Sequence, residues 1–237
     1  MAARSTFTGF PREAVEFYAA LAANNDKTWF DEHKEGFEKH VLAPARDFVF
    51  EMGKRLATIS PGVIADPRTN KSIFRPYRDT RFSKDKTPYK THLGIFFWEG
   101  NRPKMECSGF YFHLEPPDLM LAAGIHCFSK ALLGAYRDAV VHPTYGHRLT
   151  KAVKAVQREK GHLVGGEHYK KTPRGYAANR ENAPFLLYNG LYAWYSTAIP
   201  DEFYSGKLLD YALDRFKAML PLHKWLVEMT ALVGKLA

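Results

Sequence analysis

The sequence predicts an α+β fold, in which a central antiparallel sheet of about 4–6 strands is flanked by N-terminal and C-terminal helices. Apolar residues recur with the period of a helix near both ends of the chain, and they alternate with the period of a strand in the middle. The connections in the middle are short, which favours antiparallel neighbours. With 237 residues, 46% of them hydrophobic, we expect a single domain over residues 1–237.

Three helices are expected before the sheet. Pro11 suits the first position of a helix that ends at Ala23. Asp26 can cap a second helix that continues to Val41, and Pro44 can open a third. The apolar side chains of these segments follow a helical spacing, so the helices can cover one face of the sheet.

Three central segments are predicted as strands: residues 91–99, 107–115 and 118–127. Residues 72–77 can add an edge strand. Because successive side chains of a strand point to opposite faces, the sheet has two predicted faces. One face is apolar throughout and is expected to lie under the helices. Its members are Leu93, Ile95, Phe97, Phe110, Phe112, Leu114, Leu119, Leu121, Ala123 and Ile125.

The other predicted face carries His92, His113 and His126 together with Tyr111 and small residues such as Gly94. Such a face can form the floor of a ligand pocket, because small residues leave room and polar groups orient a ligand. It can equally be half-exposed or covered by the terminal helices. Three imidazoles suit a transition metal. However, the register of their strands is unknown and no metal-binding motif is present, so the sequence assigns no metal ligand and no cofactor.

The C-terminal part is predicted to be helical again. Helices are expected over residues 129–141 and 143–161. Residues 161–184 are rich in Gly, Lys, Arg and Pro and are predicted to form a long loop that is functional or mobile. Pro200 is expected to start another helical region, and Pro221 is expected to lead into a separate last helix.

Composition points to an acidic partner or ligand, since the formal net charge is +9 and the isoelectric point is about 9.4. Two cysteines, Cys107 and Cys127, exclude a disulfide scaffold and favour a reducing cytoplasm. Their strand parities differ, so they are not expected to pair. No signal peptide is recognisable, and no apolar run approaches the roughly 20 residues that span a bilayer. We expect a cytoplasmic protein with no membrane contact, and the sequence leaves the oligomeric state open.

Residues 68–90 are the most distinctive segment, with eight Lys or Arg and only two acids. Aromatic residues and prolines are interspersed among the charges, and cations beside rigid rings suit a phosphate or a carboxylate. We expect a small anionic ligand to bind the basic loop, which we define as residues 74–92, with Asp79 orienting Arg78 or Arg81. The predicted ligand-binding residues are Asn25, Trp29, Arg75, Arg78, Asp79, Arg81, Lys86, Tyr89, Lys90, His92, Tyr111 and His113.

Three alternatives remain open. The protein can be an enzyme that acts on such an anion, with His92, His113 or Tyr111 as acid or base, because histidine exchanges protons near neutral pH. No activated nucleophile and no phosphate-binding glycine motif accompanies them, so catalysis is undecided. The same charges can bind nucleic acid. Alternatively, the basic loop is purely structural, and ion pairs around Asp79 support an irregular backbone.

Three long segments are specific enough to compare with known families. They are NNDKTWFDEHKEGFEKHVLAPARDF (24–48), FRPYRDTRFSKDKTPYKTHLGIFF (74–97) and FYFHLEPPDLMLAAGIHCF (110–128). They resemble DUF2461, a bacterial and fungal family of unknown function, and the resemblance extends over nearly the whole chain. It implies no activity, cofactor or catalytic residue, although the residues of the basic loop match the family pattern. Towards the C-terminus, the family tends to have a histidine where this chain has Arg180.

Overall fold

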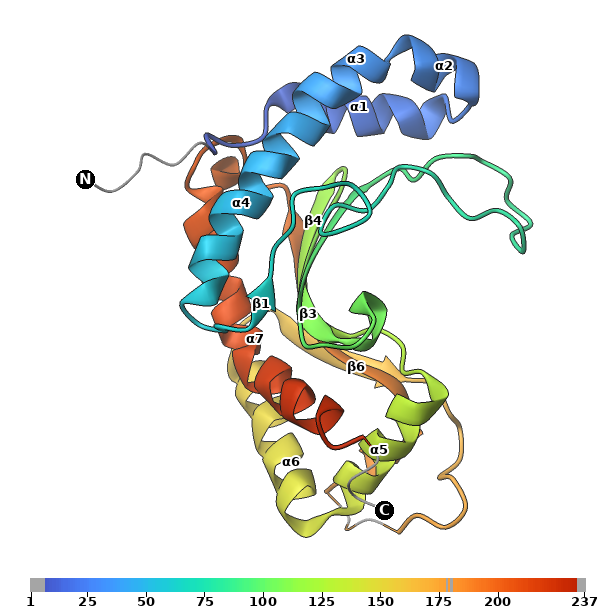
Figure 1. The fold of residues 1–237 in the computed structure, drawn as a ribbon, viewed down its shortest axis with the longest axis vertical. Helices are drawn as coiled ribbons and strands as arrows, with labels where there is room; N and C mark the ends of the chain where they lie inside the picture. Colours follow the sequence, from blue (N-terminus) through green and yellow to red (C-terminus); the bar gives the residue numbers. More distant parts are fainter. Residues whose placement is uncertain (1–6, 178, 180, 234–237) are drawn as a thin grey trace. The chain divides into compact units, whose positions relative to one another are not determined.

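The computed structural model describes residues 7–177, 179 and 181–233, and it confirms the α+β fold. Six strands form an antiparallel sheet in the order β1-β2-β3-β4-β6-β5, with helices at both ends (Figure 1). The chain divides into two compact units. Unit 1 comprises Met1–Phe97, Tyr111–Leu121 and Ser196–Asp214, and unit 2 comprises Trp98–Phe110, Ala122–Tyr195 and Arg215–Ala237. The single domain stays a prediction, and Arg180 lies outside the described residues.

Unit 1 begins with a series of helices. Their bounds are α1 (Arg12–Ala23), α2 (Lys27–Glu32), α3 (Lys34–Gly36), the π-helical η1 (Phe37–Leu42) and α4 (Ala43–Ala57). Asp26 caps α2 as predicted, since its carboxylate accepts a hydrogen bond from the Trp29 amide at 2.9 Å. The second helix is not continuous, however, because α2 ends at Glu32, where His33 takes a non-helical φ of −104°. Pro44 lies in the first turn of α4, as predicted.

The three central strands are confirmed to within two residues at each end. Their bounds are β2 (Leu93–Glu99), β3 (Ser108–Glu115) and β4 (Asp118–Ile125). In unit 1 their apolar face packs under α4, where the Phe48 ring lies 6.3 Å from Phe97 and 4.8 Å from Phe112. All three rings are fully buried. Every residue of the predicted apolar face is buried, as expected, although Phe96 and Ala122 of the other face are buried as well.

The edge strand expected at residues 72–77 is wrong. β1 (Val63–Ile64) occupies that edge of the sheet, and Ile73 and Tyr77 make only isolated bridges among the described residues. Pro76 has no amide hydrogen to donate to a neighbouring strand, so regular pairing cannot continue through it. The chain consequently leaves the sheet here and enters the basic loop.

Unit 2 contains the two helices that were predicted and most of two strands that were not. The bounds are α5 (Lys130–Val141), α6 (Pro143–Arg158), β5 (His162–Glu167), η3 (Ala183–Leu187) and β6 (Tyr188–Ala198). The loop predicted over 161–184 is therefore wrong in its first part, which forms β5 and pairs antiparallel with β6.

The C-terminal helical region follows the short η4 (Asp201–Tyr204) and consists of α7 (Leu208–Thr230). The separate helix predicted after Pro221 is wrong, because α7 continues through this proline. Burial of Leu222, Trp225 and Leu226 beyond it offsets the backbone hydrogen bond that a proline removes.

The structure bears on two expectations, one about the two cysteines and one about membrane-spanning segments. Cys107 is buried, Cys127 is exposed, and both are free thiols, as expected. Among the described residues, no helix combines the length and the apolar character that crossing a membrane requires. The cytoplasmic location stays a prediction.

Candidate functional site

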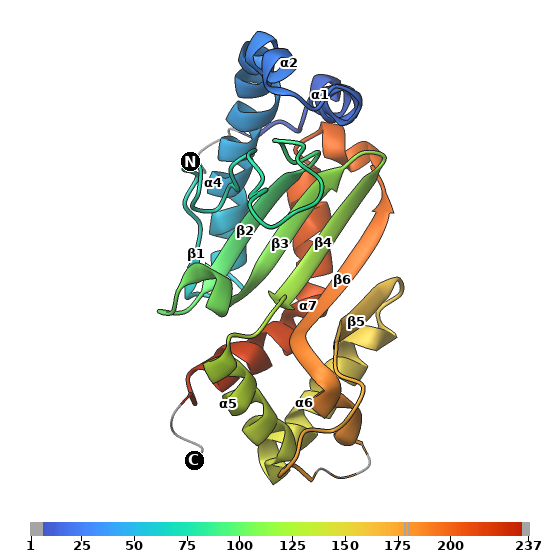
Figure 2. The ribbon, with the colours of Figure 1, turned by 90° about the vertical axis from the view of Figure 1, so that its right-hand side faces the viewer.

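The basic loop is a hairpin-like excursion from unit 1. Figure 1 shows it in teal, extending away from β2 and β3, and Figure 2 looks onto the face of these strands opposite α4. Its two arms are joined near their base, where the Arg78 amide donates to the Pro88 carbonyl at 2.9 Å and the Lys90 amide donates to the Pro76 carbonyl at 2.8 Å. The loop thus has backbone pairing of its own.

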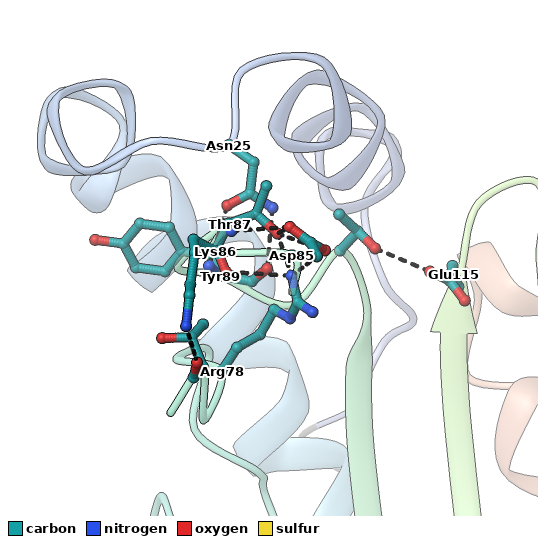
Figure 3. A network of polar contacts seen from close by, with 9 residues as sticks. Asn25, Arg78, Asp85, Lys86, Thr87, Tyr89 and Glu115 are labelled. Carbon is teal, nitrogen blue, oxygen red and sulfur yellow. Dashed lines mark hydrogen bonds and ion pairs between the residues drawn. The ribbon is translucent and has the colours of Figure 1, made fainter. Parts of the chain in front are cut away.

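Asn25, in the turn between α1 and α2, holds the base of the basic loop (Figure 3). Its side-chain amide donates to the Tyr89 carbonyl at 2.9 Å, and its side-chain oxygen accepts from the Tyr89 amide at 3.0 Å. The Tyr89 ring is 2% exposed and stacks on Phe30 with ring centroids 4.0 Å apart. These contacts give Asn25 and Tyr89 a supporting role in the loop.

Replacing Asn25 with aspartate is expected to loosen the basic loop. A carboxylate oxygen would then face the Tyr89 carbonyl, so a hydrogen bond becomes a repulsive contact that costs about 1–3 kcal/mol. Trypsin measures the effect, because the loop is rich in Lys and Arg, and cleavage within residues 75–90 should be faster. Asn24→Asp is the matched control, since the Asn24 side chain is exposed and bonds Ala20 of its own helix. Unchanged cleavage in Asn25→Asp would contradict the supporting role.

Two predicted arginines are paired with acids inside the basic loop. Arg78 forms an ion pair with Asp85 at 2.5 Å and also hydrogen-bonds Thr87 (Figure 3). Arg81 forms a two-point ion pair with Asp79, with N–O distances of 2.7 and 2.9 Å. These guanidinium groups therefore fasten one part of the loop to another.

Two predicted lysines bind backbone carbonyls of the loop. The Lys86 ammonium donates to the Thr80 carbonyl at 2.9 Å, and the Lys90 ammonium donates to the Arg75 carbonyl at 3.0 Å. A carbonyl does not neutralise the positive charge of an ammonium. These lysines can therefore still attract an anion, whereas Arg78 and Arg81 are already paired with carboxylates.

The ion pair of Asp79 makes a prediction about pH. The Arg81 side chain, which hydrogen-bonds the carboxylate, lowers the pKa of Asp79 to about 2 from an ordinary value of 3.8. A carboxylate with a lowered pKa stabilises the fold above about pH 4, and this contribution is lost as the pH falls towards 2. An NMR titration is expected to give a pKa near 2 in the parent and a value closer to 3.8 in Arg81→Gln.

Arg68→Gln is the control for this titration, because Arg68 is an exposed arginine that pairs with Asp66 instead. It should leave the titration of Asp79 in place. A midpoint near 3.8 in the parent would mean that the Arg81–Asp79 pair does not form in solution.

Three predicted side chains, His92, Tyr111 and His113, meet where β2 begins and β3 ends. The two histidine rings lie with centroids 4.3 Å apart. A hydrogen bond of 2.9 Å joins the Tyr111 hydroxyl to Nδ1 of His113, and Nε2 of His113 lies 3.3 Å from the Glu115 carboxylate. Residues 111, 113 and 115 share one face of β3, because alternate side chains of a strand point the same way.

Two further residues of this site were not among the predicted ligand-binding residues. The Thr91 hydroxyl donates to the second oxygen of Glu115 at 2.9 Å. Glu115 could have been found, since it lies two residues after His113 on the same strand parity. The Thr91 contact depends on how β2 and β3 are aligned, which the sequence does not specify. We call Thr91, His92, Tyr111, His113 and Glu115 the histidine cluster.

Burial sets the protonation states in the histidine cluster. It lowers the pKa of His92 to about 4, with a further contribution from His113, so His92 is neutral at pH 7. It raises the pKa of Tyr111 to about 12, so the hydroxyl stays protonated. Burial also acts to raise the pKa of Glu115, but hydrogen bonds from Thr91 and His113 outweigh it, and the net pKa is lowered. The cluster thus presents a neutral imidazole, a phenol and a carboxylate.

Lys90 brings a cation to the edge of the histidine cluster. The Lys90 residue is half-buried, and its ammonium lies 5.3 Å from the centre of the Phe74 ring. Burial, and then the charge of Arg75, lowers the pKa of Lys90, and Lys90 in turn contributes to the lowered pKa of His92. Within the described part of the chain, the side chains of Lys90 and Arg75 form no ion pair.

Two other residues considered from the sequence have different ring partners. Trp29 stacks on His33 with centroids 4.0 Å apart, and in unit 2 the His126 ring lies 5.4 Å from Tyr192. A surface pocket of about 540 Å³ contains none of the predicted site residues. It is lined by Arg46, Asp47, Phe50, Pro67, Arg68 and Thr69.

Comparison with known proteins supports the family but gives no activity. No curated protein matches the chain. Residues 13–225 match the family described as "Conserved hypothetical protein (DUF2461)", and this span includes the basic loop and the histidine cluster. The match covers most of the 237 residues and agrees with the resemblance of the three segments. The chain therefore belongs to the DUF2461 family.

Proposed function

We propose that this protein binds a small anion, a carboxylate or a phosphate, at the edge of the histidine cluster. The observation that carries the proposal is the half-buried residue Lys90, whose ammonium lies beside Arg75 and has no acidic partner among the described residues. Two neighbouring cations repel each other, and burial of one adds a desolvation cost. A bound anion would offset both effects, and the neutral His92 and the Tyr111 hydroxyl would supply hydrogen bonds.

A small ligand is favoured over nucleic acid by the pairing inside the basic loop. Phosphate backbones are bound by cations spread over a surface, and Arg78 and Arg81 would have to give up their carboxylate partners to take part. The same pairing supports a structural role for the outer part of the loop. Lys90 and Arg75, at its base, lie nearest to each other among the remaining cations, and Lys90 is the one that also acts on His92.

The test is a thermal-shift and calorimetric screen with inorganic phosphate, phosphate esters, small carboxylates and short oligonucleotides. A ligand that binds only the folded protein must raise its stability. We expect a phosphate or a carboxylate to stabilise the parent, and we expect Lys90→Gln to weaken its binding about tenfold or more. Lys84→Gln is the control, because it removes the same charge from an exposed position of the basic loop.

Two outcomes would overturn the proposal. One is a parent that no small anion stabilises. The other is equal weakening by Lys90→Gln and Lys84→Gln, which would indicate attraction to the overall charge rather than a site. Binding of oligonucleotides alone, with a steep dependence on salt, would favour the nucleic-acid alternative.

Acid–base catalysis on the bound anion is a second candidate, favoured by the hydrogen-bonded series Tyr111–His113–Glu115. A histidine held between a hydroxyl and a carboxylate can pass a proton. If the ligand screen identifies an anion that is turned over, His113→Gln should abolish turnover while the affinity for the anion changes little. Turnover that survives this substitution would exclude His113 as the acid or base.

A further inference from the structure

We propose that His92, His113 and Glu115 form a binding site for a divalent transition metal ion of the zinc class. One potential ligand atom from each residue lies within 4.8 Å of the others. Two imidazoles and one carboxylate are a donor set that zinc and its neighbours prefer, whereas magnesium and calcium prefer oxygen alone. The inference goes beyond the proposed anion binding and does not depend on it.

The separations are close to those that a metal requires. Four-coordinate zinc holds its ligand atoms about 2.0–2.2 Å from the metal, and therefore about 3.3 Å from one another. Nε2 of His113 and the nearer oxygen of Glu115 are already 3.3 Å apart. The other ligand-atom separations, which are up to 4.8 Å, must shorten by small side-chain rotations. The Glu115 side chain is 50% exposed and has room to rotate.

Each of two ligands is oriented by a second hydrogen bond. The Tyr111 hydroxyl contacts Nδ1 of His113 at 2.9 Å, and the Thr91 hydroxyl contacts the far oxygen of Glu115 at 2.9 Å. These contacts occupy the other ligand atoms and leave Nε2 of His113 and the near oxygen of Glu115, 3.3 Å apart, for a metal. Metal-binding histidines commonly donate their other ring N–H to such a partner, which fixes the tautomer. With the ring proton on Nδ1, His113 can donate a hydrogen bond to the Tyr111 hydroxyl and leave Nε2 as the metal ligand.

The backbone beneath the proposed ligands is regular. His113 and Glu115 are two residues apart on β3, and His92 directly precedes β2, the neighbouring strand. Strands hold a site more precisely than loops do. The side chain of His113 is 17% exposed, so the site is open to solvent on one side. Three protein ligands leave a fourth position for water or an anion, which is typical of zinc sites that act on a substrate.

The experiment uses the full chain, stripped of metal with a chelator and titrated with ZnCl2 or CoCl2 alone in a buffer free of phosphate and carboxylate. Calorimetry should show one metal per chain, and bound Co²⁺ should give the visible absorption of a site with histidine ligands. Zn²⁺ should also raise the melting temperature. We expect His113→Ala and Glu115→Gln to weaken Zn²⁺ binding at least about 100-fold, and Tyr111→Phe to weaken it about 10–100-fold.

His126→Ala is the control, because it removes an exposed histidine that contacts Tyr192 instead. It should bind Zn²⁺ as the parent does. If His113→Ala fails to fold, Glu115→Gln still tests the inference. It replaces a partly exposed carboxylate with an amide of the same shape, so it should not disturb folding. Absence of stoichiometric binding, or retention of binding in Glu115→Gln together with loss in His126→Ala, would overturn the proposal. A metal that binds while no anion does would separate this inference from the proposed function.

Discussion

Replacing His223 with alanine is expected to lower the free energy of unfolding by about 2–4 kcal/mol. His223, on α7, is 0% exposed, and its ring lies 4.4 Å from the Phe110 ring. Its Nδ1 hydrogen-bonds the Ser108 hydroxyl at 2.9 Å, and its Nε2 hydrogen-bonds the Glu99 carboxylate at 2.9 Å. Alanine removes both bonds and leaves a cavity of the size of the ring, so the polar and the packing contributions are lost together.

Chemical denaturation of His223→Ala and of His147→Ala measures this effect. His147 is exposed on α6 of the same unit, so its substitution should change stability by no more than about 0.5 kcal/mol. If His223→Ala lost no more stability than the small amount expected for His147→Ala, the hydrogen bonds and packing of His223 would not stabilise the fold.

A serine, a histidine and a carboxylate joined in this order raise the question of nucleophilic catalysis. Ser108 and His223 are both 0% exposed, so a substrate cannot reach the hydroxyl without displacing the core. The arrangement therefore stabilises unit 2, and His223→Ala should affect folding before it affects any activity. The histidine cluster differs from this triad in its exposure, because its Glu115 side chain is accessible to solvent.

The sequence predicted the central strands and their buried face because this information is local. Alternation of side chains specifies which residues share a face once a strand is recognised, and Phe97, Phe110 and Phe112 are all buried accordingly. Capping is local too, and Asp26 caps α2 as its position predicted. The end of α2 and the continuation of α7 through Pro221 depend instead on packing that a single segment does not reveal.

The strands β5 and β6 were missed because their own residues favour turns. β6 contains the dipeptide Asn189–Gly190, which is typical of a hairpin turn, although here it lies inside a strand. Its partner β5 contains Gly165–Gly166, and the pairing of the two strands is irregular between Gly165 and Glu167. These glycines are tolerated because the neighbouring backbones approach closely, which is a tertiary contact.

The candidate site was predicted only in part, because some of its contacts are local and others are tertiary. The parity of β3 placed Tyr111 and His113 on one face, and the structure shows them in contact. The role of each basic residue was not predictable, because it depends on which acid lies within reach after folding. Asp85 pairs with Arg78 across seven residues of an irregular loop. No local spacing rule specifies that contact.

Replacing Gly124 with alanine is expected to destabilise the protein by about 2–4 kcal/mol, through two effects that act together. Gly124 lies in β4 with φ of +136°, a conformation that residues with a side chain rarely adopt. A Cβ atom at this position would also lie 2.3 Å from the Leu191 carbonyl oxygen and 2.6 Å from the Tyr192 Cα atom. Both are backbone atoms of β6, so neither can move aside by a change of rotamer.

Gly134→Ala is the matched control for Gly124→Ala, because it makes the same chemical change with the opposite expected sign. Gly134 lies inside α5, and a Cβ atom there would meet nothing within 4 Å outside its own helix. Alanine favours a helix over glycine, so this variant should be more stable by about 0.5–1 kcal/mol. Denaturant unfolding of both variants gives the comparison. If Gly124→Ala were as stable as the parent, β4 and β6 would not approach each other as closely in solution as they do in the structure.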